Sequence, residues 1–264
     1  MGEHTDDEGR GVAVPERVRR VVSLVPSLTE AVAVTQPGLL VGVTDWCTHP
    51  DDLDEQGVAR IRGTKNPDVD AIVALAPDLV VANAEENKPA DLDALRAAGL
   101  AVYVTDIRTV DDAMVSLERM LAACGLDRPA WLDGVRRAWG EIPTPPERRR
   151  AVVPIWRRPW MAVGSDTFTG AVLARLGVDN ALADSVANPG LERYPRIDPA
   201  DLPPHDLVVL PDEPYRFTAD DGPEAFDAPS ALVSGRLLTW YGPSLLDAAR
   251  VLPGALGLTA GTGR

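Results

Sequence analysis

The chain has 264 residues, 45% of them hydrophobic, and a formal net charge of −14 at pH 7. This length allows one large α/β domain or two lobes, and the hydrophobic fraction is that of a globular protein, which excludes global disorder. So acidic a surface repels nucleic acid and anionic membranes, and the longest apolar run is far below the ~18 residues of a membrane helix. We therefore expect a monomer with no nucleic-acid partner and no membrane insertion.

The N-terminal stretch "MGEHTDDEGRGVAVPE" is polar and acidic, and it has no apolar core, cleavage site or lipidation cysteine of a leader. Taken literally, this predicts a cytoplasmic protein. A protein whose leader had been removed would look the same and would be periplasmic or extracytoplasmic. We expect disordered tails at residues 1–15 and 257–264.

Short valine-rich apolar runs separated by helical patterns predict the strands of parallel sheets, because strands covered on both faces are continuously apolar. The predicted strands are 21–25, 40–43, 79–82, 102–105, 151–155, 207–210 and 232–233. The fold class expected is α/β, with two Rossmann-like lobes.

Helix signals lie between these runs. Ser27 with Glu30 three residues on is a capping-box pattern, Asp68 opens a second helix, and Gly99 follows a third. A mostly helical segment over 109–142 ends at "PTPPE".

Two segments of the chain resemble each other. In each, basic residues precede an apolar run, a helical pattern follows, and a "DLVV" strand ends the unit; Arg20 precedes Asp78 by 58 positions and Arg150 precedes Asp206 by 56. Chance similarity is the alternative. The repeat predicts an N-terminal lobe over 16–108, a helical backbone linker over 109–147 and a C-terminal lobe over 148–256.

Ligands bind beyond the carboxyl ends of strands in open α/β sheets, so the residues that follow each predicted strand are candidates. The set is Ser27, Trp46, Asn83, Glu85, Glu86, Trp156, Arg157, Arg158, Trp160, Tyr215, Trp240 and Tyr241. Four of the six tryptophans are among them. Loop aromatics of this kind line a ligand pocket or, alternatively, plug the interface between lobes.

The stretch "TDWCTHP" raises the question of a metal or thiol site at Cys47 and His49. Their spacing of two places both side chains on one side of an extended segment, and Asp45 would be a third ligand. No phosphate-binding loop or nucleophile-elbow motif is present in the sequence. A cytoplasmic metal-dependent enzyme or chelatase that uses Cys47 and His49 is therefore one alternative function.

The motifs together resemble a known family. The runs "RVVSLVPSLTEAVAV", "VGVTDWCTHP", "GTKNPDVDAIVALAPDLVVANAEEN", "AVGSDTFTGAVLARLGVDNAL" and "LLTWYGPSLLDAARVL" are similar to class III substrate-binding proteins of ABC importers, the helical-backbone metal receptors. The vitamin B12-binding branch is nearest, and the similarity covers about residues 15–255. It implies two α/β lobes joined by a long helix, with the ligand in the cleft between them.

The resemblance also implies roles for single residues. Trp46 matches an aromatic position beside the cobalamin, and Trp156, Trp160 and Trp240 lie on loops that line the cleft. Glu85 or Glu86 corresponds to an acidic residue that docks on the permease. The second-lobe counterpart falls near Asp166, where an aspartate stands in place of a glutamate.

The chain departs from the family in lacking an export signal and in a short backbone helix, residues 129–142, about 21 Å long at 1.5 Å per residue. The leading hypothesis is a non-catalytic binding protein with no catalytic cofactor. Its ligand would be a metal-containing small molecule, a cobalamin or other corrinoid first and a ferric siderophore or heme second. Arg157 or Arg158 would bind an anionic group of the ligand. In an alternative interpretation, His49 is an axial ligand to the metal. An ABC permease is the expected partner; a ligand-sensing regulatory scaffold is the remaining alternative.

Overall fold

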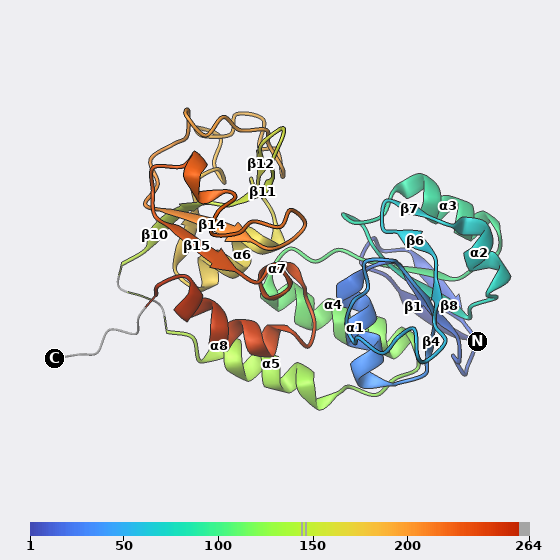
Figure 1. The fold of residues 1–264 in the computed structure, drawn as a ribbon. Helices are drawn as coiled ribbons and strands as arrows, with labels where there is room; N and C mark the ends of the chain where they lie inside the picture. Colours follow the sequence, from blue (N-terminus) through green and yellow to red (C-terminus); the bar gives the residue numbers. More distant parts are fainter. Residues whose placement is uncertain (144, 146, 259–264) are drawn as a thin grey trace. The chain divides into compact units, whose positions relative to one another are not determined.

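The computed structural model describes residues 1–143, 145 and 147–258, which form two compact units, each with its own parallel sheet (Figure 1). Unit 1 comprises Met1–Ile107, Asp111–Gly134 and Tyr241–Pro243. Unit 2 comprises Arg108–Val110, Val135–Trp240 and the residues from Ser244 onward. The predicted α/β class with parallel sheets is confirmed.

The sheet of unit 1 has five parallel strands in the order β5-β4-β3-β8-β9. They are β3 (Val21–Ser23), β4 (Leu40–Val43), β5 (Ala59–Arg60), β8 (Leu79–Asn83) and β9 (Val102–Thr105). Every residue of β3, β8 and β9 is buried, which explains why continuous apolar runs mark these strands in the sequence. The two residues of β5 are too few to leave a pattern, and this strand was not predicted.

The helices of unit 1 follow the predicted signals at two of three places. They are α1 (Pro26–Thr35), α2 (Val69–Ala74), α3 (Pro89–Ala97) and α4 (Val110–Ala123). The side chain of Asp68 caps α2, and Gly99 follows α3 at φ 85°, the left-handed conformation that glycine adopts without strain. The capping box is wrong: α1 already begins at Pro26, so Ser27 and Glu30 lie inside the helix and are buried.

The sheet of unit 2 has four parallel strands in the order β13-β10-β14-β15. They are β10 (Arg149–Val152), β13 (Val178–Asn180), β14 (Leu207–Pro211) and β15 (Ser230–Val233). The helices of unit 2 are the second half of α5 (Ala130–Gly140), α6 (Phe168–Arg175), η1 (Pro223–Ala225), α7 (Gly235–Thr239) and α8 (Leu245–Ala255). Only the first residue of β13 is buried, so this strand shows no apolar run and was not predicted.

Each unit also contains a short antiparallel hairpin, and the one in unit 2 carries the candidate residue Trp156. These hairpins are β6 (Arg62–Gly63) with β7 (Asn66–Pro67), and β11 (Pro154–Trp156) with β12 (Met161–Ala162). The single strand predicted over 151–155 is therefore two strands. β10 ends at Val152, and β11 leaves the parallel sheet to pair with β12.

The N-terminal residues form a hairpin, so the disordered tail predicted for residues 1–15 is wrong. Strand β1 (Gly2–Thr5) pairs antiparallel with β2 (Gly11–Val14). The hairpin packs against the rest of unit 1, with Val12 and Val14 almost fully buried. Burying this apolar pair offsets the entropy lost when an otherwise polar segment becomes ordered.

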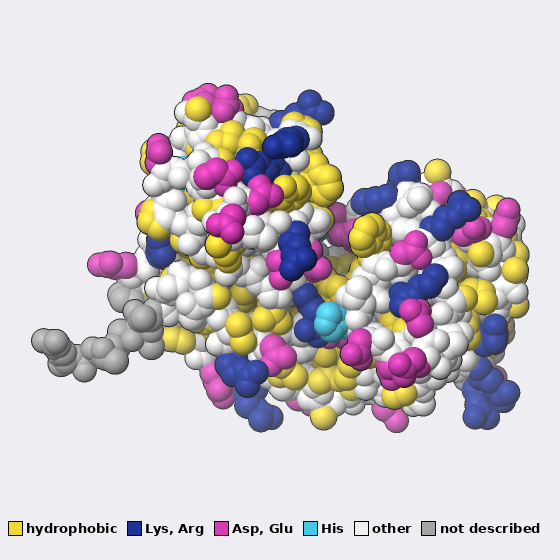
Figure 2. All heavy atoms as spheres, viewed as in Figure 1, with side chains coloured by type: hydrophobic (Ala, Val, Ile, Leu, Met, Phe, Trp, Pro, Cys, Tyr) yellow, Lys and Arg dark blue, Asp and Glu magenta, His cyan; other side chains and the backbone are white. Residues whose placement is uncertain are grey.

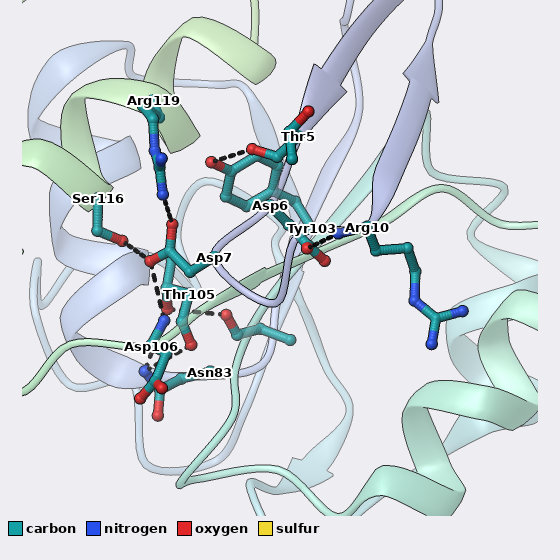
Figure 3. Close-up of polar contacts among 11 residues, drawn as sticks. Thr5, Asp6, Asp7, Arg10, Asn83, Tyr103, Thr105, Asp106, Ser116 and Arg119 are labelled. Carbon is teal, nitrogen blue, oxygen red and sulfur yellow. Dashed lines mark hydrogen bonds and ion pairs between the residues drawn. The ribbon is translucent and has the colours of Figure 1, made fainter.

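Asp7, in the turn of this hairpin, connects it to β9 and α4 (Figure 3). Its backbone N–H donates to the Val104 carbonyl at 3.0 Å. Its carboxylate accepts from the Ser116 hydroxyl at 2.5 Å and from the Asp106 N–H at 2.9 Å, and it pairs with the Arg119 guanidinium. The hairpin is thus attached where β9 ends.

The predicted linker over 109–147 is helical but is not a separate domain. It holds two helices, of which α4 falls almost entirely in unit 1, and α5 is divided between the units at Gly134 and Val135. Residues 144 and 146 of this segment, and 259–264 of the predicted C-terminal tail, lie outside the described residues. Leu258 donates its N–H to the Pro253 carbonyl at 2.8 Å, so the ordered chain extends past the predicted start of that tail.

In the part of the chain that the structure describes, no helix is both long enough and apolar enough to span a bilayer.

Candidate functional site

Trp46 is a solvent-exposed aromatic side chain of unit 1. It follows β4 at the carboxyl edge of the sheet, and 66% of its surface is exposed. The indole lies beside the β6–β7 hairpin: a Cβ built on Gly63 would lie 3.1 Å from its Nε1 atom. A flat, exposed ring supported along one edge is suited to packing on another flat apolar surface.

Cys47 turns the opposite way, into the core, so the predicted pairing with His49 is not found. The Cys47 thiol is fully buried and lies 3.0 Å from the Thr29 hydroxyl and 3.1 Å from the Thr44 hydroxyl. Burial raises the pKa of the Cys47 thiol, against the opposing effect of these hydroxyl contacts, so the thiolate that would bind a metal or attack a substrate is disfavoured.

His49 is half-buried, and its Nδ1 atom lies 3.1 Å from the Thr48 hydroxyl. Nowhere in residues 1–143, 145 and 147–258 do three or more His, Cys, Asp or Glu side chains gather as a metal site. The arrangement around Cys47 therefore gives no support to the metalloenzyme alternative.

Asn83, predicted to contact a ligand, instead builds the loop after β8. Its amide nitrogen donates to the carbonyl and the hydroxyl of Thr105, both at 3.1 Å. Its amide oxygen accepts from the N–H groups of Glu85 at 3.0 Å and Glu86 at 3.2 Å. Because its side chain is buried and these polar atoms are engaged, Asn83 positions the two half-buried glutamates and offers nothing to a ligand.

Ser27 and Tyr241, also predicted ligand contacts, are buried together in unit 1. Burial raises the pKa of the Tyr241 phenol well above its usual value, Glu86 adds to the rise, and a hydrogen bond from Ser27 opposes it. The phenol therefore stays protonated and is poorly suited to bind a metal as phenolate. Both residues are part of the structure beneath the carboxyl edge.

In unit 2, five rings from the loops after β10 and β14 form a group that we call the aromatic cluster. Its members are Trp156, Trp160, Tyr215, Phe217 and Phe226. Trp160 stacks on Phe217 with ring centroids 5.9 Å apart and an interplanar angle of 3°, and it meets Phe226 edge-on at 5.2 Å. Trp160 is therefore part of a small core within unit 2 and is not an open pocket wall.

Trp156 is the open member of the aromatic cluster, with 44% of its surface exposed. It meets Tyr215 edge-on, with ring centroids 5.8 Å apart and an interplanar angle of 80°. Figure 2 shows apolar side chains on the visible face of unit 2, with basic and acidic side chains among them. Phe217 and Phe226 were not among the predicted site residues, although Phe217 lies only two positions after Tyr215 in "PYRF".

Arg157, expected to bind an anionic group of the ligand, is already paired within unit 2. Its guanidinium contacts the carboxylates of Asp221 and, at 2.6 Å, Glu224, and it lies over the Trp160 ring at 5.1 Å. Tyr215 donates its hydroxyl hydrogen to Asp221 at 2.6 Å. An anionic ligand group at Arg157 would therefore compete with these two carboxylates, and the predicted anchoring role stays a prediction.

Trp240 is buried, not exposed as a cleft-lining residue would be. Its indole hydrogen bonds to Glu213, and the Arg236 guanidinium lies 5.7 Å from the centre of its ring. Burial raises the pKa of Glu213, and the hydrogen bond from Trp240 works against that rise. Trp240 thus holds a partly buried carboxyl group inside unit 2.

Asp166, the expected second docking acid, lies in the turn before α6 with its side chain 67% exposed. Its carboxylate is 2.5 Å from Arg108, and its carbonyl accepts from Arg193 at 2.9 Å. An ion pair this exposed contributes little to stability, so Asp166 remains accessible to a competing cation.

Comparison with known proteins supports the resemblance seen in the motifs, although no protein-family model matches the chain. The chain is 32% identical over 107 residues to the vitamin B12-binding protein of Vibrio parahaemolyticus, covering 40% of this chain and 38% of that protein. It is 32% identical over 130 residues to an uncharacterized ABC transporter substrate-binding lipoprotein of Bacillus subtilis, covering 47% and 40%. The matches thus span about two fifths of these relatives' lengths.

Solved structures match over much more of the chain. BtuF, the periplasmic vitamin B12 binding protein of Vibrio cholerae, superposes with a TM-score of 0.69 at 19% identity over 91% of this chain and 97% of its own. CeuE of Helicobacter pylori with Ni(II) bound gives a TM-score of 0.77 at 13% identity over 97% and 89%. The chain therefore has the two-lobed α/β fold of these binding proteins, as the motifs predicted.

Proposed function

We propose that this chain is a non-catalytic binding protein for a metal-containing small molecule, of the kind that delivers ligands to ABC importers. The preferred ligand is a corrinoid, and a ferric siderophore or heme is second. The proposal relies mainly on two exposed indoles: Trp46, in the loop after parallel strand β4 of unit 1, and Trp156, at the end of β11 in the antiparallel hairpin that follows β10 of unit 2. Large flat ligands are commonly bound by such rings, and the names of the relatives point to the same ligand class.

The contact residues we propose are fewer than the sequence implied. Trp46 and Trp156 meet the ligand. Tyr215 supports Trp156 from behind through its edge-on contact. Because the metal of a corrinoid or siderophore already has its ligands, this mode of binding needs no metal site in the protein itself.

For the partner, we propose an ABC permease that contacts the acidic residues Glu85 and Glu86 in unit 1 and Asp166 in unit 2. The backbone N–H groups of Glu85 and Glu86 are hydrogen bonded to Asn83. The carboxylate of Asp166 forms an exposed ion pair with Arg108, which a cation of the permease could replace. We also propose that the protein is a monomer and works outside the cytoplasmic membrane, which gel filtration and cell fractionation would test.

The function is tested by titrating the protein with hydroxocobalamin, a ferric hydroxamate siderophore and hemin, followed by gel filtration and absorbance of the protein peak. Trp46→Ala and Trp156→Ala should each weaken binding by about 1–3 kcal/mol, the scale of one buried aromatic contact. Trp131→Phe is the matched control, because that indole hydrogen bonds to Thr35 on a different part of unit 1. Failure of all three ligands to co-elute with the wild-type protein would disprove the proposal.

A further inference from the structure

The charges around the aromatic cluster indicate which ligands its open face accepts. Arg157 is the cation that contacts the aromatic cluster through Trp160, and its side chain is only 19% exposed. Its guanidinium carbon lies over the Trp160 ring, and its two terminal nitrogens are paired with Asp221 and Glu224. An acidic group on a ligand would have to displace one of these carboxylates.

Both carboxylates are themselves fixed in place. Asp221 accepts from the Tyr215 hydroxyl at 2.6 Å, and Glu224 accepts from the Gly222 N–H at 2.6 Å. Charge-assisted hydrogen bonds of this kind are shorter and stronger than neutral ones, so the arrangement resists opening. The hydrogen bond from Tyr215, and after it the positive charges of Arg157 and of exposed Arg158, lower the pKa of Asp221. The Arg157 guanidinium is thus paired with two carboxylates.

We infer that the face around Trp156 selects planar ligands whose rim carries no net negative charge, because Asp221 and Glu224 neutralise Arg157, which would otherwise bind an anionic rim. Arg157 is then a positioning residue: it ties the 221–224 turn to Trp160 and keeps the aromatic cluster rigid. This inference rests on the proposed function and narrows its ligand class toward neutral or cationic metal macrocycles.

The test uses two zinc porphyrins with the same ring and opposite rims, one bearing four N-methylpyridinium groups and one bearing four sulfonatophenyl groups. Cyanocobalamin serves as a separate check of the proposed function. Affinities are measured by absorbance titration at about 0.15 M salt, where the Debye length of about 8 Å limits the effect of the net charge of the whole protein. The wild-type protein should bind the cationic porphyrin at least about tenfold more tightly, a difference of about 1.4 kcal/mol.

Asp221→Asn with Glu224→Gln removes the two carboxylates and should reduce that preference by about tenfold or more, because a released guanidinium gains a charge-assisted bond to a sulfonate. The matched control is Asp201→Asn with Asp247→Asn, which changes the net charge equally at exposed positions elsewhere on unit 2. It should change the preference less than about threefold, since its charges are screened. Arg157→Gln leaves Asp221 and Glu224 without their guanidinium partner and should strengthen the preference for the cationic porphyrin. This single variant tests the inference if the double variant does not fold.

The outcomes separate the two proposals. Cyanocobalamin binding together with equal affinities for the two porphyrins, or with no binding of either, would overturn the inference and leave the proposed function standing. A control variant that shifts the preference as much as the site variant would also overturn it, because bulk charge would then be the cause. If no probe binds any version of the protein, both proposals fail.

Discussion

Asp7 should contribute more to stability than any other acidic residue of the N-terminal hairpin. Its carboxylate, only 7% exposed, accepts from the Ser116 hydroxyl and from the Asp106 N–H and pairs with Arg119 (Figure 3). Hydrogen bonds to a charged group contribute about 1.5–3 kcal/mol each, whereas an ion pair with a half-exposed arginine adds about 0–1 kcal/mol. Water will replace part of what is lost, so Asp7→Ala should cost about 3 kcal/mol.

Glu8→Ala is the matched control, because it removes the same charge one position along the chain. Glu8 is 42% exposed and lies 3.6 Å from Arg96, so its loss should cost about 0.5 kcal/mol. With about 2–4 °C per kcal/mol for a protein of this size, Asp7→Ala should lower the melting midpoint of unit 1 by about 6–12 °C, and Glu8→Ala by about 1–2 °C.

Limited trypsin digestion gives a local reading of the same contact. Arg10 lies in the exposed part of the hairpin turn, so a detached hairpin should be cut there much faster. Mass spectrometry of Asp7→Ala should therefore show early loss of residues 1–10. Equal melting shifts for the two variants, or an unchanged rate of cleavage after Arg10, would refute the argument that Asp7 attaches the hairpin.

Three further predictions concern single side chains. Burial raises the pKa of Tyr103 to about 12 in the folded protein, against about 10 when unfolded. Because the folded state holds this proton more tightly, the free energy of unfolding should fall by on the order of 2 kcal/mol between pH 10 and 12. Urea titrations should find a smaller loss over the same pH range in Tyr103→Phe. The buried, raised-pKa thiol of Cys47 should not react with an aromatic disulfide reagent at pH 8 until urea is added, and rapid labelling of native protein would show that the loop opens. Trp240→Ala should cost about 3–5 kcal/mol of stability, as for other buried tryptophans, and calorimetry that finds no such loss would return Trp240 to the list of open ligand contacts.

The sequence predicted the strands of the two sheets better than it predicted the ends of the chain. The run that contains β8 is buried at every residue, so hydrophobicity alone marks it. The N-terminal hairpin has only two buried valines, Val12 and Val14, and its attachment depends on Asp7 meeting Arg119 at a separation of 112 residues. A turn signal, "DDEG" before "VAV", was present, but no local pattern reveals so distant a partner.

The candidate site shows the same limit. Position after a strand predicts which edge of a sheet a residue occupies, and this was correct for Trp46. It does not predict whether the side chain turns outward, as Trp46 does, or inward, as Cys47 and Trp240 do. Nor could it show that Arg157 would be neutralised, because Asp221 lies 64 positions away in the sequence.

The central claim is that Trp46 and Trp156 contact a bound metal macrocycle. Hydroxyl-radical footprinting read by mass spectrometry, with and without saturating hydroxocobalamin, tests it directly, because oxidation of an indole depends on its exposure to solvent. Both tryptophans should be oxidised readily in the free protein, in keeping with their exposed fractions of 66% and 44%, and both should be protected several-fold by the ligand. Tight binding that leaves the oxidation of both residues unchanged would contradict the account.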